Sequence, residues 1–443
     1  MPRPRRSAPP GAEARIVIGL DLGPNYSAVA YCDEKGAAEG TSGIQLITSW
    51  PGMATQNATN EKVPSRIAYG TPPEPEILWG NQIKHNTKAP IYSCMKLKLD
   101  EDMSGPGRFR RFLALIARDM VGMDIEDANE TPNEPPEYPG KSTVDMVADY
   151  LTKVRETTWD VLEQQYGKVL FSSMKKELVV TVPAVWSERA KNLTLKAVNR
   201  AEFNASKIFL LSEPEAAAIY TLKGIREGPS RDDIKIGDVF VLCDAGRSTV
   251  DLISYKITQL EPNLSVEEAA IGSGGKCGAS YVESEFLSWL EKWIGSEAFH
   301  KIPIEKTRHD SQMMASFENN KSYFSGDDDE MEIRIPAESG IQNSEELNID
   351  EGTLTLSTAQ MKQIFNPCIN GTIQLIDGQV TAVMKSGLGK PKMVLVVGGF
   401  GRNKYLYRKI QEYCSTRGIG TRQPKFPWSA VARGAVCRGL EPV

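Results

Sequence analysis

The sequence predicts an α/β protein, and three observations carry this prediction. Short apolar runs of strand length alternate along the chain with amphipathic segments of helix length, separated by turns rich in glycine and proline. The chain has 443 residues, which is enough for two or more domains with a substantial core. Its hydrophobic content of 40% and charged content of 25% are ordinary for a soluble globular protein.

The overall charge and hydropathy argue against two classes of partner. The net charge is −5, which gives no basic footprint for nucleic acid. No run of the sequence is long and apolar enough to span a membrane. The opening residues, MPRPRRSAPPGAEAR, are basic and rich in proline but lack the apolar core of a secretory signal. We therefore predict a disordered tail over residues 1–15, with a nuclear-targeting segment as the alternative.

The cysteines and histidines limit the chemistry further. The seven cysteines are odd in number, scattered, and never spaced as C-x-x-C, which argues against a disulfide framework and a zinc site. This usage favours a reducing compartment, and we predict a cytoplasmic protein. Only three histidines are present, so histidine-based triads and di-histidine metal sites are not expected.

Two hairpins of the same design lie more than two hundred residues apart. The first, RIVIGLDLGPNYSAVAYCDE, is an apolar run that reaches Asp21-Leu22-Gly23 and is followed by an alternating run. The second, VFVLCDAGRSTVDLISY, places Asp244-Ala245-Gly246 at the same point. Ser27 and Thr249 follow at nearby offsets. The repetition predicts two related lobes that face each other.

The chemistry of these hairpins suits a phosphate site. A glycine in the turn lets backbone N–H groups approach a phosphate closely. An aspartate at the strand end repels phosphate, but it can hold Mg²⁺, usually through water, and the metal bridges to phosphate oxygens. The alternative is a pair of ordinary hairpins in which Asp and Gly are turn residues.

Strand–helix units follow in the middle of the chain. Val144, Val147, Leu151 and Val154 recur at helical spacing and predict an amphipathic helix that packs in the core. In KELVVTVPAVWSERAK a strand and a proline precede a helix, with Ser187 as the N-cap.

The segment KIFLLSEPEAAAIYTL is a strand followed directly by a helix. Pro214 suits the first helical position, which makes Glu213 the N-cap. Glutamate is not a favoured N-cap, so its carboxylate is either placed for another purpose or is a surface acid near the helix dipole.

Glycine turns and one charged helix complete the set of motifs. PKMVLVVGGFGRNKYLYRKI is an apolar strand, a glycine turn and an amphipathic helix, a context that allows close approach to a nucleotide. AAIGSGGKCGASYVESEFL is another glycine turn before a helix. In FENNKSYFS, Glu318, Lys321 and Ser325 are spaced to share one helical face, for which a solvated surface is the alternative.

With these motifs assembled in order, the chain resembles the nucleotide-binding domain of the seventy-kilodalton heat-shock chaperone family, within the actin and sugar-kinase superfamily. The resemblance covers about Ile16 to Leu440 and looks closest to the divergent fungal and animal branch. It implies a two-lobed actin-like ATPase fold, built from duplicated ribonuclease-H-like domains around a nucleotide cleft. The family's peptide-binding half would follow the closing helix, and since this chain stops at CRGLEPV we do not expect a peptide-holding cycle.

The resemblance assigns roles in the first half of the chain. GLDLGPNYSAVAY matches the first phosphate motif, in which Asp21 would be a water-mediated Mg²⁺ partner and the turn would hold phosphate through Gly23, Asn25 and Tyr26. YSCMKLKLD matches the segment of the catalytic lysine, with Lys96 as the better match and Lys98 as the alternative. LLSEPEAAAIY matches the motif whose glutamate, here Glu213, orients metal-bound and hydrolytic water.

The second half would complete the site. In the second phosphate motif Asp244 would hold metal-bound water or assist the attacking water, and Asp251 would be the second acid at the metal. The phosphate contacts of this half would be Gly246, Thr249, Gly274 and Gly275. The adenosine contacts would be Glu318, Lys321, Ser325, Gly398, Gly399 and Arg402. PWSAVARGAVCRGL resembles the closing helix, although Ser429 stands where an acid is usual.

The chain departs from the family where the terminal phosphate should lie. Pro24 and Asn25 replace two threonines, and proline has no N–H to donate. Arg247 and Ser248 replace two glycines, and we expect a side chain there to hinder close backbone approach. Arg247 either supplies its guanidinium to a phosphate or points to solvent. We expect nucleotide binding to survive these changes better than hydrolysis.

The predicted organisation is lobe I over residues 16–182 and lobe II over 183–443, with Pro183 as the hinge, an outer subdomain over about 276–385 and a closing helix over about 428–440 that packs back on lobe I. ATP or ADP with Mg²⁺ would lie at the bottom of the cleft, between the two hairpins. The expected function is an ATP-binding, chaperone-like protein with slow or impaired Mg²⁺-dependent ATP hydrolysis. A protein co-chaperone or exchange factor would be a further partner. The alternatives are a non-catalytic, nucleotide-gated interaction module and a small-molecule kinase.

Overall fold

The computed structural model describes residues 14–53, 60–70, 76–84, 87–100, 138, 140–229, 233–308, 311–327 and 330–441. These residues form several sheets and many helices, so the predicted α/β class is confirmed. They divide into two units, the first from the ranges 1–101, 137–223 and 431–443, and the second from 224–430. Within the described ranges, none of the helices combines the length and apolar character needed to cross a lipid bilayer.

The first unit is built on a mixed sheet in the order β3-β2-β1-β8-β9, with β4 beside β2. Its antiparallel part is the hairpin of β1 and β2, and β8 and β9 run parallel to β1. A smaller antiparallel sheet has the order β6-β5-β7. The strands are β1 (Arg15–Leu22), β2 (Tyr26–Asp33), β3 (Gln45–Leu46), β4 (Val63–Pro64), β5 (Arg66–Tyr69), β6 (Ile77–Trp79), β7 (Ile91–Ser93), β8 (Lys175–Val182) and β9 (Lys207–Ser212).

The helices of the first unit follow the predicted pattern. They are α1 (Glu34–Ala37), α4 (Thr143–Tyr166), α5 (Lys168–Ser173), α6 (Glu188–Arg200), α7 (Glu213–Glu227) and α14 (Ala430–Gly439), with 3-10 turns that include η3 (Met95–Leu99). In α4 the predicted core positions Val147, Leu151 and Val154 are buried. Ser187 caps α6 by accepting the Ala190 N–H, as predicted.

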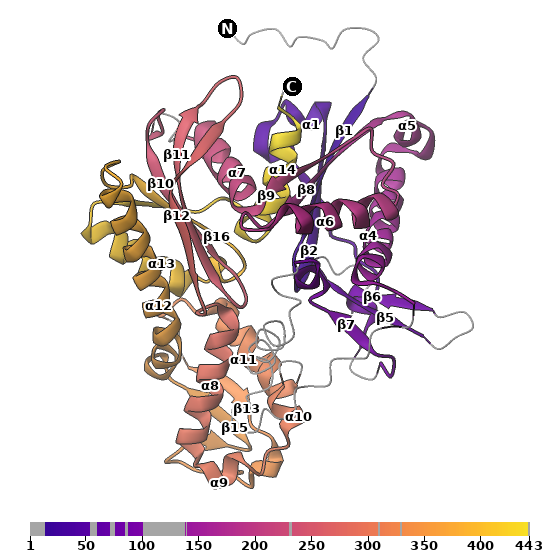
Figure 1. The fold of residues 1–443 in the computed structure, drawn as a ribbon. Helices are drawn as coiled ribbons and strands as arrows, with labels where there is room; N and C mark the ends of the chain where they lie inside the picture. Colours follow the sequence, from indigo (N-terminus) through magenta and orange to yellow (C-terminus); the bar gives the residue numbers. More distant parts are fainter. Residues whose placement is uncertain are drawn as a thin grey trace. The chain divides into compact units, whose positions relative to one another are not determined.

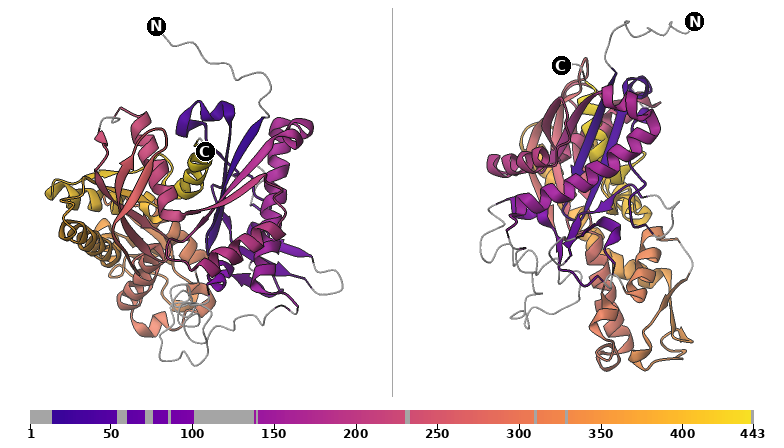
Figure 2. Two further views of the ribbon diagram at one scale, coloured as in Figure 1. Left: turned by 45° about the horizontal axis from the view of Figure 1, so that its top comes forward. Right: turned by 90° about the vertical axis from the view of Figure 1, so that its right-hand side faces the viewer.

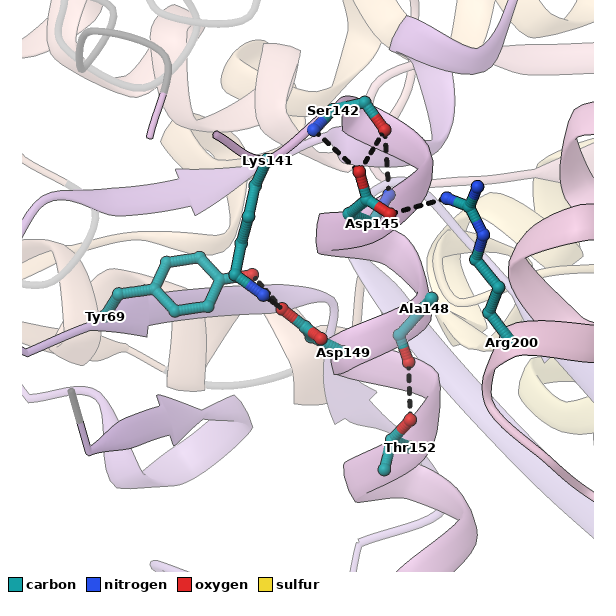
Figure 3. Close-up of polar contacts among 8 residues, drawn as sticks. All are labelled: Tyr69, Lys141, Ser142, Asp145, Ala148, Asp149, Thr152 and Arg200. Carbon is teal, nitrogen blue, oxygen red and sulfur yellow. Dashed lines mark hydrogen bonds and ion pairs between the residues drawn. The ribbon is translucent and has the colours of Figure 1, made fainter. Parts of the chain in front are cut away.

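A partly exposed ion pair connects α4 with α6 at the start of α4. Ser142 caps α4 in a reciprocal capping box with Asp145. Arg200, the last residue of α6, donates to Asp145 Oδ1 at 2.5 Å, as Figure 3 shows. The capping carboxylate therefore also joins the two helices that cover one face of the sheet, a layer visible in Figure 1.

The two faces of β1 have different partners because side chains alternate along a strand. Ile16, Ile18 and Leu20 join the core that includes α4 and α6. On the opposite face, Gly19 lies so close to α14 that an added Cβ would overlap the Ala432 carbonyl oxygen. Helix α14, yellow, accordingly lies beside β1, indigo, in Figure 1 and in both views of Figure 2. Asp21 belongs to this second face by its position in the alternation.

The second unit contains a sheet in the order β12-β11-β10-β16-β17 and a small sheet in the order β13-β15-β14. Its strands are β10 (Val239–Ala245), β11 (Val250–Gln259), β12 (Ser265–Gly275), β13 (Met331–Arg334), β14 (Ile349–Asp350), β15 (Thr353–Leu356), β16 (Met393–Val397) and β17 (Gly420–Arg422). Its helices are α8 (Ala279–Ile294), α9 (Ser296–Phe299), α10 (Ile304–Thr307), α11 (Gln312–Tyr323), α12 (Thr358–Lys385) and α13 (Lys404–Thr416). Helices α12 and α13 cover one face of the larger sheet (Figure 1).

The two larger sheets share one topology. In each sheet, the first three strands along the chain are antiparallel neighbours and lie in the order third, second, first. Two later strands lie on the other side of the first strand and run parallel to it. The alternation is also shared, because Val241, Cys243 and Ala245 of β10 face their core and Asp244 belongs to the other face. Asp21 and Asp244 are thus equivalent positions of two similar sheets.

Several expectations about the chain's organisation meet the structure only in part. Residues 1–13 of the predicted tail lie outside the described residues, whereas Arg15 is the first residue of β1 and forms an ion pair with Glu177. All seven cysteines are free and buried. The lobe boundaries at residues 16–182 and 183–443, the hinge at Pro183 and the outer subdomain stay predictions.

Candidate functional site

The first hairpin turn is a four-residue loop between Leu22 and Ser27, which are opposite each other in the β1–β2 register. The Gly23 N–H donates to the Tyr26 carbonyl oxygen at 3.1 Å, and a Cβ on Gly23 would overlap that oxygen. Pro24 and Asn25 occupy the two central positions. The turn therefore closes on itself through its glycine, and Pro24 brings no donor to it.

The second hairpin turn has the same length and closure. Ala245 is opposite Val250, and the Gly246 N–H donates to the Thr249 carbonyl oxygen at 2.9 Å. The Arg247 carbonyl oxygen accepts from the Ser280 N–H at 2.8 Å, which attaches this turn to the start of α8. The two Asp-x-Gly hairpins predicted from the sequence thus also share their backbone geometry.

Asp21 has a partner on each carboxylate oxygen. Thr181 Oγ1 donates to Oδ1 at 3.2 Å, and Lys62 Nζ donates to Oδ2 at 2.8 Å. The Asp21 and Lys62 side chains are only 6% and 12% exposed. Asp21, the acid predicted to face a metal ion, is therefore paired with the ammonium group of Lys62, the residue just before β4.

The predicted catalytic lysine and glutamate lie together. The 3-10 turn η3 buries Lys96, whose ammonium forms an ion pair with Glu213 and lies 5.5 Å from the centre of the Trp186 ring. Burial raises the pKa of the Glu213 carboxyl above its ordinary value, while the Lys96 ammonium opposes this shift. The alternative lysine, Lys98, is partly exposed on the same turn.

The four groups of the first unit form one electrostatic cluster, because Asp21 and Lys62 both act on Glu213 as well. The cluster contains two carboxylates and two ammonium groups. The sequence prediction that Glu213 is an N-cap is wrong. Helix α7 starts at Glu213, and the Ser212 hydroxyl accepts the Glu215 N–H at 3.3 Å, so the better capping residue takes that position.

In the second unit, Asp244 lies against the glycine turn after β16. Gly398 has φ +89°, and a Cβ there would overlap both the Ala245 carbonyl oxygen and Asp244 Oδ1. Asp251 is opposite Asp244 in the β10–β11 register, and Thr249 Oγ1 donates to its Oδ2 at 2.7 Å. A Cβ on Gly274 would overlap Asp251 Oδ1. Two of the predicted glycines therefore leave space for the two acids.

A buried charge network connects the second hairpin turn with α11. Glu283 of α8 accepts from Lys321 Nζ at 2.6 Å on one oxygen and from Arg247 Nη2 at 3.2 Å on the other. Lys321 also forms an ion pair with Glu318. The Glu283 side chain is 2% exposed. Arg247 therefore forms an ion pair here. The solvated-face alternative is wrong for Lys321, whose side chain is 4% exposed, whereas the Glu318 side chain is 34% exposed.

Ser325 does not share the helical face of Glu318 and Lys321, which corrects the sequence prediction. Helix α11 ends at Tyr323, and Phe324 takes non-helical angles of φ −57° and ψ 120°. Phe324 is fully buried, and Gly326 has φ +87°. Burial of the Phe324 ring thus ends the helix before Ser325.

The remaining predicted adenosine contacts gather around a tryptophan. A Cβ on Gly399 would lie 3.2 Å from the Trp428 ring, and the Arg402 guanidinium lies 5.5 Å from the ring centre. Gly275, which was predicted as a phosphate contact, faces Leu375 of α12 instead of this ring. A Cβ added to Gly275 would be 2.9 Å from Leu375 Cδ1. The glycine turn after β16 is therefore packed under an aromatic ring rather than open on that side.

Residues of these sites that had not been anticipated from the sequence include Lys62, Glu283 and Trp428. Lys62 and Glu283 contact predicted site residues across long sequence separations and carry no motif of their own. Trp428 lies within the PWSAVARG segment, directly before Ser429, so an aromatic residue at this point was the one signal that could have been read.

The fit of a magnesium ion can be tested on the acids. Across the described part of the chain, no three His, Cys, Asp or Glu side chains come together in a group that could hold a metal by direct coordination. Each Asp21 oxygen already accepts one hydrogen bond, and a magnesium ion bound directly at Oδ2 would have to compete with the Lys62 ammonium. The predicted metal roles of Asp21, Asp244 and Asp251, and the convergence of the two hairpins on one nucleotide, stay predictions.

Comparison with known proteins gives distant relatives. No family model matches the sequence. The chain is 22% identical over 515 residues to human heat shock 70 kDa protein 12B, covering 100% of this chain and 71% of that protein. It is 22% identical to mouse heat shock 70 kDa protein 12A over 96% of this chain and 70% of that protein. It is 22% identical to the chaperone protein HscA homolog of Acinetobacter baumannii strain AYE, over 93% of this chain and 56% of that protein. These matches support a distant relationship to the 70 kDa heat-shock proteins.

Proposed function

We propose that this protein binds ATP or ADP as a chaperone-like member of the divergent fungal and animal branch of the 70 kDa heat-shock family, with slow or impaired Mg²⁺-dependent hydrolysis. One observation carries the proposal. Two sheets of the same topology each carry an aspartate as the next-to-last residue of their first strand, and a self-closing glycine turn follows each strand. A duplicated ribonuclease-H-like core with paired phosphate hairpins accounts for this repetition, and the distant relatives support it.

The residues have distinct parts in this proposal. Lys96 supplies a point charge toward a transferring phosphoryl group, and Glu213, held by Lys96, positions water. Asp244 supplies the second carboxylate, in the space that Gly398 leaves. When bound, magnesium would neutralise phosphate charge, and Asp244 and Asp251 would hold its water ligands. Lys321 and Glu318, with Arg402, would hold the adenosine.

The turns explain why hydrolysis is proposed to be slow. Gly23 and Gly246 use their N–H groups within their own turns, and Pro24 has none. Few backbone donors therefore remain for the charge that develops on a terminal phosphate.

A single-turnover assay tests the proposal. Purified protein is mixed with a substoichiometric amount of ATP at millimolar Mg²⁺, and bound nucleotide and released phosphate are followed separately. We expect the protein to bind nucleotide and to release phosphate slowly. We expect Asp244→Asn and Lys96→Ala to abolish this phosphate release. No nucleotide binding under these conditions would reject the function, and release that is unchanged in Asp244→Asn would identify a contaminating ATPase.

The second candidate is a non-catalytic interaction module that uses nucleotide state to present a surface to a co-chaperone or exchange factor. The Arg247–Glu283 ion pair favours it, because the side chain that replaces a glycine is held within the unit. Thermal stabilisation by ATP or ADP without any phosphate release would support this candidate. Phosphate release that is lost in Lys96→Ala would exclude it.

A further inference from the structure

The Lys62 ammonium lies beside the Asp21 carboxylate, where a metal ion is predicted to bind. It is 2.8 Å from Asp21 Oδ2, and Thr181 takes the other oxygen. Both partners of the ion pair are nearly buried, at 12% and 6% exposure of their side chains. A charge pair removed from water to this degree is weakly screened, so a competing ion has to displace an ammonium that already satisfies the carboxylate.

The charge balance of the cluster depends on this lysine. With Lys62, two ammonium groups face the carboxylates of Asp21 and Glu213. Without it, Lys96 alone would face two carboxylates, and the excess negative charge would repel a nucleotide polyphosphate. A divalent cation would then be required to offset that repulsion. The Lys62 ammonium offsets it within the protein.

We propose that Lys62 supplies at the first hairpin the positive charge that a metal ion would otherwise bring to Asp21, so that ATP and ADP bind without a divalent cation. An ammonium has three N–H donors, so it can contact Asp21 and a phosphate oxygen together. Hydrolysis, where it occurs, retains its need for metal. The inference rests on the proposed nucleotide-binding function and concerns binding alone.

Calorimetric titration of the full chain with ADP and with ATP tests this, first in EDTA and then in millimolar Mg²⁺. For the wild type we expect the nucleotide affinities in the two buffers to agree within about tenfold. This difference is smaller than the change in affinity that the loss of one charged hydrogen bond produces. For Lys62→Met we expect binding in EDTA to weaken by about tenfold to a hundredfold and to recover in Mg²⁺. Lys62→Arg keeps the charge and should behave as the wild type.

Lys141→Met is the matched control. Lys141 pairs with Asp149 at 2.5 Å, so the same two residue types are joined in the same unit, and Figure 3 shows this pair beside Tyr69. Neither residue belongs to the hairpin cluster. We expect the ratio of affinities in the two buffers to equal that of the wild type.

A second readout uses the protein without nucleotide. Removal of the ammonium uncovers the Asp21 carboxylate, so Mg²⁺ alone should raise the melting temperature of Lys62→Met and leave that of the wild type unchanged. Wild-type binding that requires Mg²⁺ would overturn the inference while leaving the proposed function intact, and this comparison needs no variant. Unaltered EDTA binding in Lys62→Met would overturn it as well. A wild type that binds nucleotide in neither buffer would instead reject the proposed function itself.

Discussion

The ammonium of Lys321 lies 2.6 Å from a carboxylate oxygen of Glu283, and both side chains are almost completely buried. A buried carboxylate of this kind is tolerated only when cations or hydrogen bonds satisfy it. Arg247 supplies the second cation. Glu283 is therefore the residue through which the second hairpin turn and helix α11 are connected.

Glu283→Gln should destabilise the protein, because it leaves Lys321 and Arg247 facing a neutral amide. We expect a loss of about 3 kcal/mol or more in the free energy of unfolding, the usual result of removing one partner from a buried ion pair. Urea unfolding followed by tryptophan fluorescence measures it. Glu291→Gln on the same helix is the control and should cost no more than about 0.5 kcal/mol, because Glu291 is 35% exposed. Equal losses in both variants would contradict the assigned role of Glu283.

Lys96 and Glu213 should be energetically coupled. Lys96→Met leaves a largely buried carboxylate without its cation, and we expect a cost of about 3 kcal/mol. In a double-mutant cycle with Glu213→Gln, the combined loss should fall short of the sum of the single losses by about 1 to 3 kcal/mol. Additive losses would show that the ion pair contributes nothing to stability.

The Glu213 carboxyl should also give the stability a pH dependence. Its pKa is raised by burial above the ordinary value of 4.5, so the folded state binds more protons than the unfolded state in the interval above that value. Its contribution to stability is present at low pH and is lost as the pH rises through the folded pKa. The melting temperature of Glu213→Gln should therefore rise relative to that of the wild type as the pH increases from about 4 to about 7. Glu188→Gln, at a side chain 85% exposed, should show a flat difference across this range.

Gly398→Ala should be costly for two separable reasons. Its φ of +89° disfavours any side chain, and the new Cβ would overlap the Ala245 carbonyl oxygen and Asp244 Oδ1. Gly389→Ala isolates the first reason, because Gly389 has φ +77° and no atom within 4 Å of an added Cβ. We expect about 1 kcal/mol for Gly389→Ala and at least about 2 kcal/mol more for Gly398→Ala, by urea unfolding. The same cost in both would mean that the space beside Asp244 is not limiting.

Pro24→Thr should restore a backbone donor to the first turn. If a missing N–H limits hydrolysis, the single-turnover rate should rise by about tenfold, the effect of one added hydrogen bond to a charged oxygen. Nucleotide affinity should change less than the rate, because the charge develops during the reaction. A rate that stays at the wild-type value would show that Pro24 is not responsible for slow turnover.

The local parts of this fold could be predicted from the sequence, and the long-range parts could not. The Asp-x-Gly hairpins, the strand–glycine turn–helix at Gly398 and the Ser187 cap depend on neighbouring residues, whose steric and hydrogen-bonding preferences act within one turn. The Lys62–Asp21 and Lys321–Glu283 ion pairs join residues 41 and 38 positions apart. No spacing rule applies at that separation, so these partners follow only from the tertiary structure.

The two corrected predictions failed because a competing local preference was stronger. Ser212 is a better cap than Glu213, so α7 begins one residue earlier than Pro214 alone would indicate. The spacing of Glu318, Lys321 and Ser325 assumed a continuing helix, whereas burial of Phe324 ends it. Helical periodicity predicts a shared face only as far as the helix itself continues.

The burial of all seven thiols has a practical consequence. Burial raises the pKa of Cys32 to about 12 and that of Cys94 to about 11, so little reactive thiolate is present at neutral pH. A cysteine introduced at an exposed position, such as Val185 at 92% exposure or Ile236 at 64%, should react with maleimide dyes far faster than any native thiol. Energy transfer between dyes at these two positions, one in each unit, would report directly how the separation of the units responds to added nucleotide.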